Sequence, residues 1–179
     1  MKPAAAILLG LMLAAAVAAR AQVSDPLTPS EAAQVRDTAG KPEKRLPLLL
    51  AFAEQRLNQF EQVRLATPRP PGRDAQLYAL LRQYAAILPE FDDAAGDLAS
   101  GAGRTSLSDQ KKYNLLKILT PVVATLQHLQ TMLQHIQTAS SPSDLANYHF
   151  ELQECLDVTS DTLQDTQDEL PPAPAAAHP

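Results

Sequence analysis

Tryptophan is absent from this sequence of 179 residues, aromatic residues make up only 4% of it, and Cys155 is its single cysteine. One cysteine cannot form an internal disulfide, so the small folds that depend on several disulfides are excluded. With so few aromatic residues, a core has to be built from Leu, Ala, Val and Ile, which is typical of helical bundles. We expect Cys155 to be a small buried hydrophobic residue, and an intermolecular disulfide is the alternative.

Catalytic and metal-binding patterns are also missing. None of the four histidines falls on a predicted core stripe. His128 and His135 are about 10 Å apart along a helix, too far to share a metal ion. No Cys-x-x-Cys-His motif for haem attachment is present. The serines precede or begin predicted helices, where capping explains them. We therefore expect no enzyme, no cofactor and no resident metal ion.

Basic residues are absent after Lys117, although the sequence has 15 lysines and arginines in total. The formal net charge of −5 makes nucleic acid a poor partner. Acidic residues continue as far as Glu169, and five of them form a stripe at spacings of three or four residues: Glu154, Asp157, Asp161, Asp165 and Asp168. Like charges so spaced repel each other unless a basic surface lies beside them.

A basic surface for this acidic stripe is available on the first long predicted helix. Its candidates are Lys44, Arg45, Arg56 and Arg64. The first and fourth helices of a simple bundle are neighbours, so we expect the stripe and these residues to pair. The alternatives are docking to a basic partner and loose binding of a divalent cation by Asp157, Asp161 and Asp165.

The N-terminus has the pattern of a secretory signal peptide. Lys2 precedes an apolar stretch from Ala4 to Ala19, and small residues flank Arg20. This pattern predicts a signal peptide over residues 1–21, cleaved between Ala21 and Gln22, and hence a periplasmic or secreted bacterial protein. The alternative is an uncleaved membrane anchor. No later segment resembles a membrane span.

Helical patterns fill most of the remaining chain. Thr28 and Glu31 form a capping box that predicts a short helix to about Thr38. Apolar residues at alternating spacings of three and four predict longer helices over residues 43–66, 74–99, 106–139 and 142–169, the third capped by Ser106 or Ser108. Pro121 predicts a kink in the third of them.

The four long helices fold most simply as an all-α, up-down-up-down bundle over residues 22–170. A three-helix core with one helix swapped into a dimer is the alternative. Residues 171–179 are rich in proline and alanine and are predicted to be a disordered tail.

The third long helix has an uncharged outer side. No charged residue occurs between Ile118 and Pro142. The residues away from its apolar stripe are Gln127, His128, Gln130, Thr131, Gln134 and His135. Protein interfaces lack charge at their centres, so we predict an interaction face, with an ordinary neutral surface as the alternative. By elimination, the sequence favours a non-enzymatic protein that binds another protein or itself through its third and fourth long helices. A cation-responsive bundle that uses the acidic stripe is the alternative.

Overall fold

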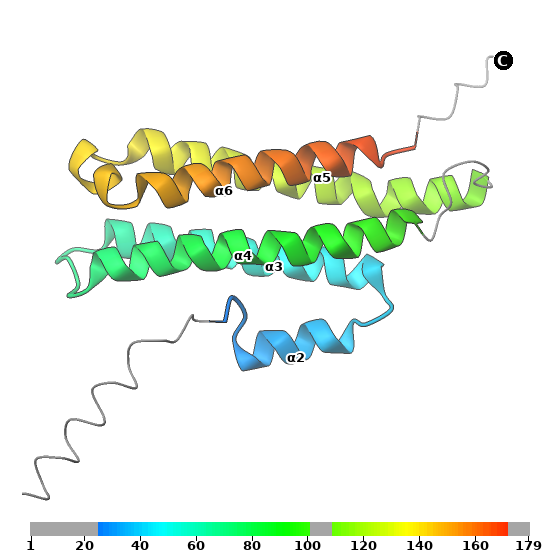
Figure 1. Ribbon diagram of the computed structural model, residues 1–179, viewed down its shortest axis with the longest axis horizontal. Coiled ribbons are helices and arrows are strands. Elements are labelled where there is room, and N and C mark those ends of the chain that lie inside the picture. Colours follow the sequence, from blue (N-terminus) through cyan, green and yellow to red (C-terminus); the bar gives the residue numbers. More distant parts are fainter. Residues whose placement is uncertain (1–24, 101–108, 172–179) are drawn as a thin grey trace, which may run out of the picture.

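The computed structural model describes residues 25–100 and 109–171, and its regular elements there are all α-helices (Figure 1). They are α2 (Pro29–Asp37), α3 (Pro42–Leu65), α4 (Arg73–Ser100), α5 (Asp109–Ala139) and α6 (Pro142–Asp168). The predicted all-α class is confirmed. The described chain has one helix more than the four of the predicted bundle, because the short α2 adds to the four long helices.

Several predictions concern residues outside these ranges. They are the signal peptide with its cleavage point at Ala21 and Gln22, the caps at Ser106 and Ser108, and the tail after Pro171.

The predicted helix starts at α2 and α6 are confirmed. In α2 the Glu31 N–H donates to Thr28 Oγ1 at 3.3 Å, and the Thr28 N–H donates to Glu31 Oε2 at 2.7 Å. In α6 the Asp144 N–H donates to the Ser141 hydroxyl at 3.2 Å. A proline follows each cap at the first helical position, where its missing N–H costs least.

The four long helices form two hairpins, α3 with α4 and α5 with α6, that lie against each other as two layers (Figure 1). Between the layers, α4 packs on α6 and α3 packs on α5. Both of these pairs are parallel. Leu81 and Asp92 of α4 meet Cys155 and Thr162 of α6 in the same order along the chain. The order around the core is therefore α3, α4, α6, α5.

This order contradicts the expected contact between the first and fourth long helices. Helix α3 packs mainly on α4 and α5, and so does α6. Helices α3 and α6 therefore lie diagonally opposite each other. The expected pairing of the acidic stripe with Lys44, Arg45, Arg56 and Arg64 of α3 is wrong. The arginines pair elsewhere: Arg45 with Glu90 of α4, Arg56 with Glu31 of α2, and Arg64 with Glu61 on α3 itself.

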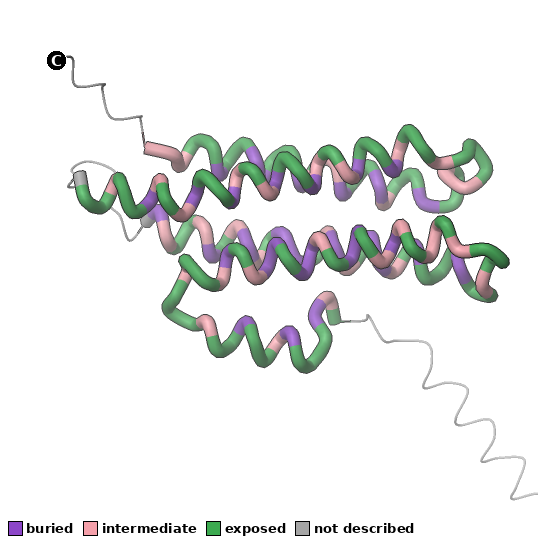
Figure 2. Tube along the Cα trace, turned by 180° about the vertical axis from the view of Figure 1, so that it is seen from behind, coloured by how far each residue is buried: buried purple, intermediate pink, exposed green. Residues whose placement is uncertain are grey.

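The core is formed by the predicted apolar stripes, and buried positions recur along each helix at the spacing of these stripes (Figure 2). Cys155 is completely buried, as expected, and its thiol donates to the Leu81 carbonyl oxygen at 3.4 Å. The second half of α6 packs through threonines. Thr159 and Thr166 are buried, and each donates its hydroxyl to the carbonyl four residues earlier. These hydrogen bonds remove the cost of burying a hydroxyl.

Helical geometry is interrupted in α6, whereas α5 is one continuous element that includes Pro121. Tyr148 has φ −140° and ψ 18° inside α6. Its hydroxyl donates to the Ser140 hydroxyl at 2.7 Å, and its ring packs edge-on against Phe60 at a centroid distance of 5.1 Å. The sequence carries no proline or glycine at this point that would predict the break.

Candidate functional site

The predicted interaction face lies on the outside of α5. Gln127, Thr131 and Gln134 are exposed there, and Gln130 is half-buried. Three further exposed residues extend the same stripe in both directions: Thr120, Ala124 and Thr138. We call this stripe, from Thr120 to Thr138, the outer face of α5. Its side chains are small or uncharged along its whole length.

The two histidines of the predicted face point toward α3. His128 Nε2 lies 3.8 Å from Glu54 Oε1, and His135 Nδ1 lies 3.8 Å from Glu61 Oε1. Glu61 also accepts two hydrogen bonds from the Arg64 guanidinium. Both histidines are more than half exposed, so they sit at the edge between α5 and α3. The outer face is therefore narrower than the sequence predicted.

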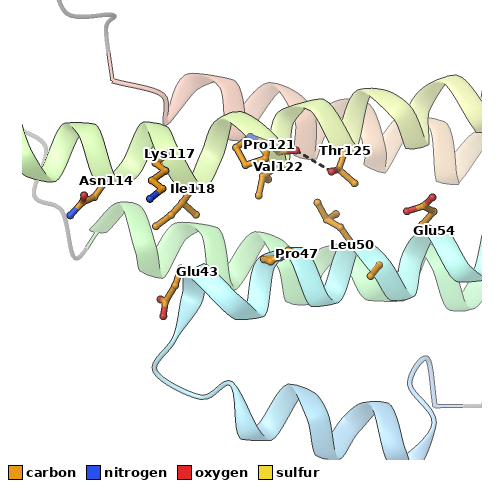
Figure 3. A pocket seen from close by; sticks show the side chains of 11 residues that line it. Glu43, Pro47, Leu50, Glu54, Asn114, Lys117, Ile118, Pro121, Val122 and Thr125 are labelled. Carbon is orange, nitrogen blue, oxygen red and sulfur yellow. Dashed lines mark hydrogen bonds between the residues drawn. The ribbon is translucent and has the colours of Figure 1, made fainter.

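A groove opens between α3 and α5 next to this edge (Figure 3). Its volume is about 620 Å³, within the range typical of ligand sites. The apolar lining consists of Pro47, Leu50 and Ala51 from α3 and Ile118, Pro121 and Val122 from α5. The polar lining consists of Glu43, Glu54, Asn114, Lys117 and Thr125.

Two prolines lie at the same level of this groove. Helices α3 and α5 are parallel, and His128 of α5 lies beside Glu54 of α3. Pro121 and Pro47 each lie seven residues before these two residues, so the prolines face each other across the groove. A proline inside a helix donates no hydrogen bond to the carbonyl four residues earlier. The Thr125 hydroxyl donates to the Pro121 carbonyl at 3.0 Å. Sequence reasoning missed the groove, because its two walls come from α3 and α5 and no local sequence pattern indicates that these helices are neighbours.

The acidic stripe of α6 is exposed. Gln153 donates to Asp157, and Gln164 donates to Asp168, each within the helix. In the described ranges, no three His, Cys, Asp or Glu side chains are arranged to hold a metal ion. The alternative of a cation site at Asp157, Asp161 and Asp165 therefore has no support from the geometry.

One carboxylate near this stripe has a perturbed pKa. Asp92 of α4 is half-buried, and its Oδ2 accepts a hydrogen bond from the Thr162 hydroxyl at 3.0 Å. Burial raises the pKa of Asp92 to about 6 in spite of that hydrogen bond, and the nearby Asp165 adds to the rise. Asp165, Asp168 and Glu169 share a hollow with Asp92 between α4 and α6.

One buried arginine, Arg73, holds the helices together at the end where the two hairpins turn. Arg73 Nη1 donates to Asp144 Oδ1 at 3.0 Å, and Arg73 Nη2 donates to the Arg64 carbonyl at 3.0 Å. The Arg73 guanidinium holds the pKa of Asp144 below its ordinary value. These contacts join α3, α4 and α6 and have a structural role.

None of the helices in the described parts of the chain has the length and apolar character needed to cross a membrane. Comparison with models of protein families, with curated proteins and with solved structures finds no match to this chain.

Proposed function

We propose that this protein is an exported, non-enzymatic four-helix bundle that associates with a second polypeptide through the outer face of α5, and that a second copy of the chain is the partner. The observation that carries the proposal is the exposed, uncharged stripe from Thr120 to Thr138. The absence of charge removes the main cost of desolvating a surface at the centre of an interface.

The chemistry of this face favours a second copy. Glutamine and threonine each carry hydrogen-bond donors and acceptors, so a surface built from Gln127, Thr131 and Gln134 can pair with itself about a two-fold axis. The outer side of α6 would not tolerate the same contact. Its exposed Asp157 and Asp161 would meet the carboxylates of the copy. The proposal therefore places the contact on α5 rather than on α6.

Cysteine cross-linking tests this arrangement, because the native thiol of Cys155 is buried. Thr131→Cys places a reactive thiol on the proposed interface, and Gln62→Cys places one on the exposed surface of α3. Mild oxidation is expected to give a disulfide-linked dimer with Thr131→Cys, while Gln62→Cys stays monomeric. Equal dimer formation by both variants would show collision without an interface and would refute the assignment.

The proposal of export rests on the N-terminal sequence. The apolar stretch from Ala4 to Ala19 and the small residues at Ala19 and Ala21 fit a signal peptide. Intact-mass measurement of the protein from a bacterial periplasm or medium is expected to show Gln22 as the first residue. A mass that retains Met1 in the exported fraction would show that the segment is not cleaved.

A cation-responsive bundle is the second candidate. It is favoured by the hollow between α4 and α6 that Asp92 shares with Asp165 and Asp168. Weak binding of calcium would reduce the repulsion between these carboxylates and raise the melting temperature of the native protein. The rise would be smaller in the variant Asp165→Asn, which has lost one of the carboxylates. Equal shifts in both proteins would exclude this hollow.

A further inference from the structure

We propose that the groove between α3 and α5 binds an extended, apolar polypeptide segment that carries a basic residue. This site is separate from the outer face of α5. The residues of α5 that line the groove are Asn114, Lys117, Ile118, Pro121, Val122 and Thr125. None of them belongs to the outer face. Either site can therefore fail its test without the other.

The groove is extended along α5. At the end where α5 begins, a second hollow of about 330 Å³ shares Asn114 and Ile118 with the main groove and reaches Lys111. The two hollows together follow α5 from Lys111 to Thr125, which is about 21 Å at the rise of an α-helix. An extended chain of about six residues has this length.

The hydrogen-bonding groups beside the apolar lining favour a polypeptide over a hydrocarbon chain. Pro47 donates no hydrogen bond to the Glu43 carbonyl, and Pro121 donates none to the Lys117 carbonyl. Both prolines line the groove (Figure 3). The carbonyl groups of Glu43 and Lys117 therefore lie next to an apolar surface, and each lacks the N–H donor that an uninterrupted helix would supply. The backbone N–H groups of an extended peptide can fill this role, whereas an acyl chain cannot.

The charges around the groove favour a basic residue in the ligand. Glu43 and Glu54 lie on the α3 side, and Lys117 lies on the opposite side (Figure 3). The adjoining hollow adds Asp97 and Lys111, whose opposite charges leave the excess of carboxylates unchanged. The chain as a whole carries a formal charge of −5, which has the same sign as this excess of carboxylates. A lysine or arginine near Glu54 would gain a partner there, while an acidic peptide would be repelled.

Fluorescence anisotropy with labelled probes tests the proposal on the chain that begins at Gln22. The first probe is a synthetic peptide of roughly six residues, matched to the groove length, in which leucine alternates with serine and one end carries a lysine. The second probe has glutamate in place of that lysine, and the third is a labelled dodecanoic acid. We expect the lysine peptide to bind about fivefold more tightly than the glutamate peptide, a difference typical of one exposed charge pair.

Three variants locate the binding. Ala51 lines the groove and is exposed, so Ala51→Trp fills the groove without replacing a core residue. Gln55→Trp is the control, because Gln55 is exposed on the same helix and does not line the groove. Glu54→Gln removes one carboxylate. Circular dichroism and thermal unfolding confirm that each variant is folded.

Ala51→Trp is expected to weaken binding of the lysine peptide more than tenfold, and Gln55→Trp is expected to leave it unchanged. Glu54→Gln is expected to weaken binding of the lysine peptide about threefold and, because it removes a repulsion, to strengthen binding of the glutamate peptide. Binding of dodecanoic acid without binding of the peptide would overturn the proposal in favour of a lipid site. Peptide binding that Ala51→Trp does not alter, or no peptide binding at all, would also overturn it.

Discussion

Arg56 of α3 and Glu31 of α2 form a buried two-point ion pair, in which Arg56 Nη1 lies 3.0 Å from Glu31 Oε1 and Nη2 contacts Glu31 Oε2. Arg56 Nη2 also donates to the Pro26 carbonyl at 3.0 Å. The same Glu31 carboxylate accepts the N–H of Thr28 in the capping box. One side chain therefore both starts α2 and attaches it to α3.

Arg56→Ala is expected to lower the free energy of unfolding by about 3–5 kcal/mol, because it leaves the Glu31 carboxylate buried without its main partner. Urea denaturation measures this change. Arg36→Ala is the matched control, since Arg36 is an exposed arginine of α2 and its loss is expected to change stability by less than about 0.5 kcal/mol. Equal effects of the two variants would show that the ion pair does not hold α2 in place.

The raised pKa of Asp92 predicts the pH dependence of stability. The folded protein binds this proton more tightly than the unfolded chain, whose ordinary pKa is 3.8. The contribution of this proton to the stability of the folded protein is therefore complete below pH 3.8 and is lost as the pH rises through about 6. Asp92→Asn is expected to raise stability at neutral pH by about 1 kcal/mol, after allowance for partial exposure of the carboxylate, and to flatten the pH profile between about pH 4 and 6.

Urea unfolding across this pH range checks the prediction, with Asp93→Asn as control because Asp93 is the exposed neighbour. An unchanged slope in Asp92→Asn would contradict the assignment. At lower pH the opposite effect is expected. Burial raises the pKa of Glu31, but the hydrogen bonds from Arg56 and Thr28 and the charge of Arg56 together outweigh burial and lower that pKa. Arg73 lowers the pKa of Asp144. Their contributions are lost as the pH falls through those lowered values.

The buried thiol of Cys155 predicts slow chemical modification. Burial raises the pKa of Cys155, so little thiolate is present at neutral pH, and the reagent cannot reach the sulfur. A colorimetric disulfide reagent is expected to react within minutes in denaturant and to be essentially inert toward the native protein. Rapid, stoichiometric reaction in native buffer would contradict this burial and would restore the possibility of an intermolecular disulfide.

Local features of the fold were predictable from the sequence. The capping box at Thr28 and Glu31, the serine cap at Ser141 and the inward positions of Cys155 and Thr159 follow from spacings within one helix. The packing order was not predictable. Consecutive amphipathic helices carry similar apolar stripes, so nothing in those stripes indicates that α4 packs on α6 rather than on α5.

In the candidate sites, too, the local features were predictable and those that depend on helix packing were not. The exposure of Gln127, Thr131 and Gln134 was predictable from helical periodicity. The orientation of His128 toward Glu54 and the groove at Pro47 depend on which helix lies beside α5, and that neighbour is known only once the two hairpins are placed.

Self-association through α5 is the central claim, and light scattering after size-exclusion chromatography tests it most directly. The chain from Gln22 is measured over a range of concentrations, beside a variant with Thr131→Glu and Gln134→Glu on the outer face. We predict a mass twice that of the monomer for the native chain and a monomeric mass for the variant, because paired carboxylates would repel across the interface. A native chain that stays monomeric at every concentration, or a variant that still dimerises, would contradict the claim.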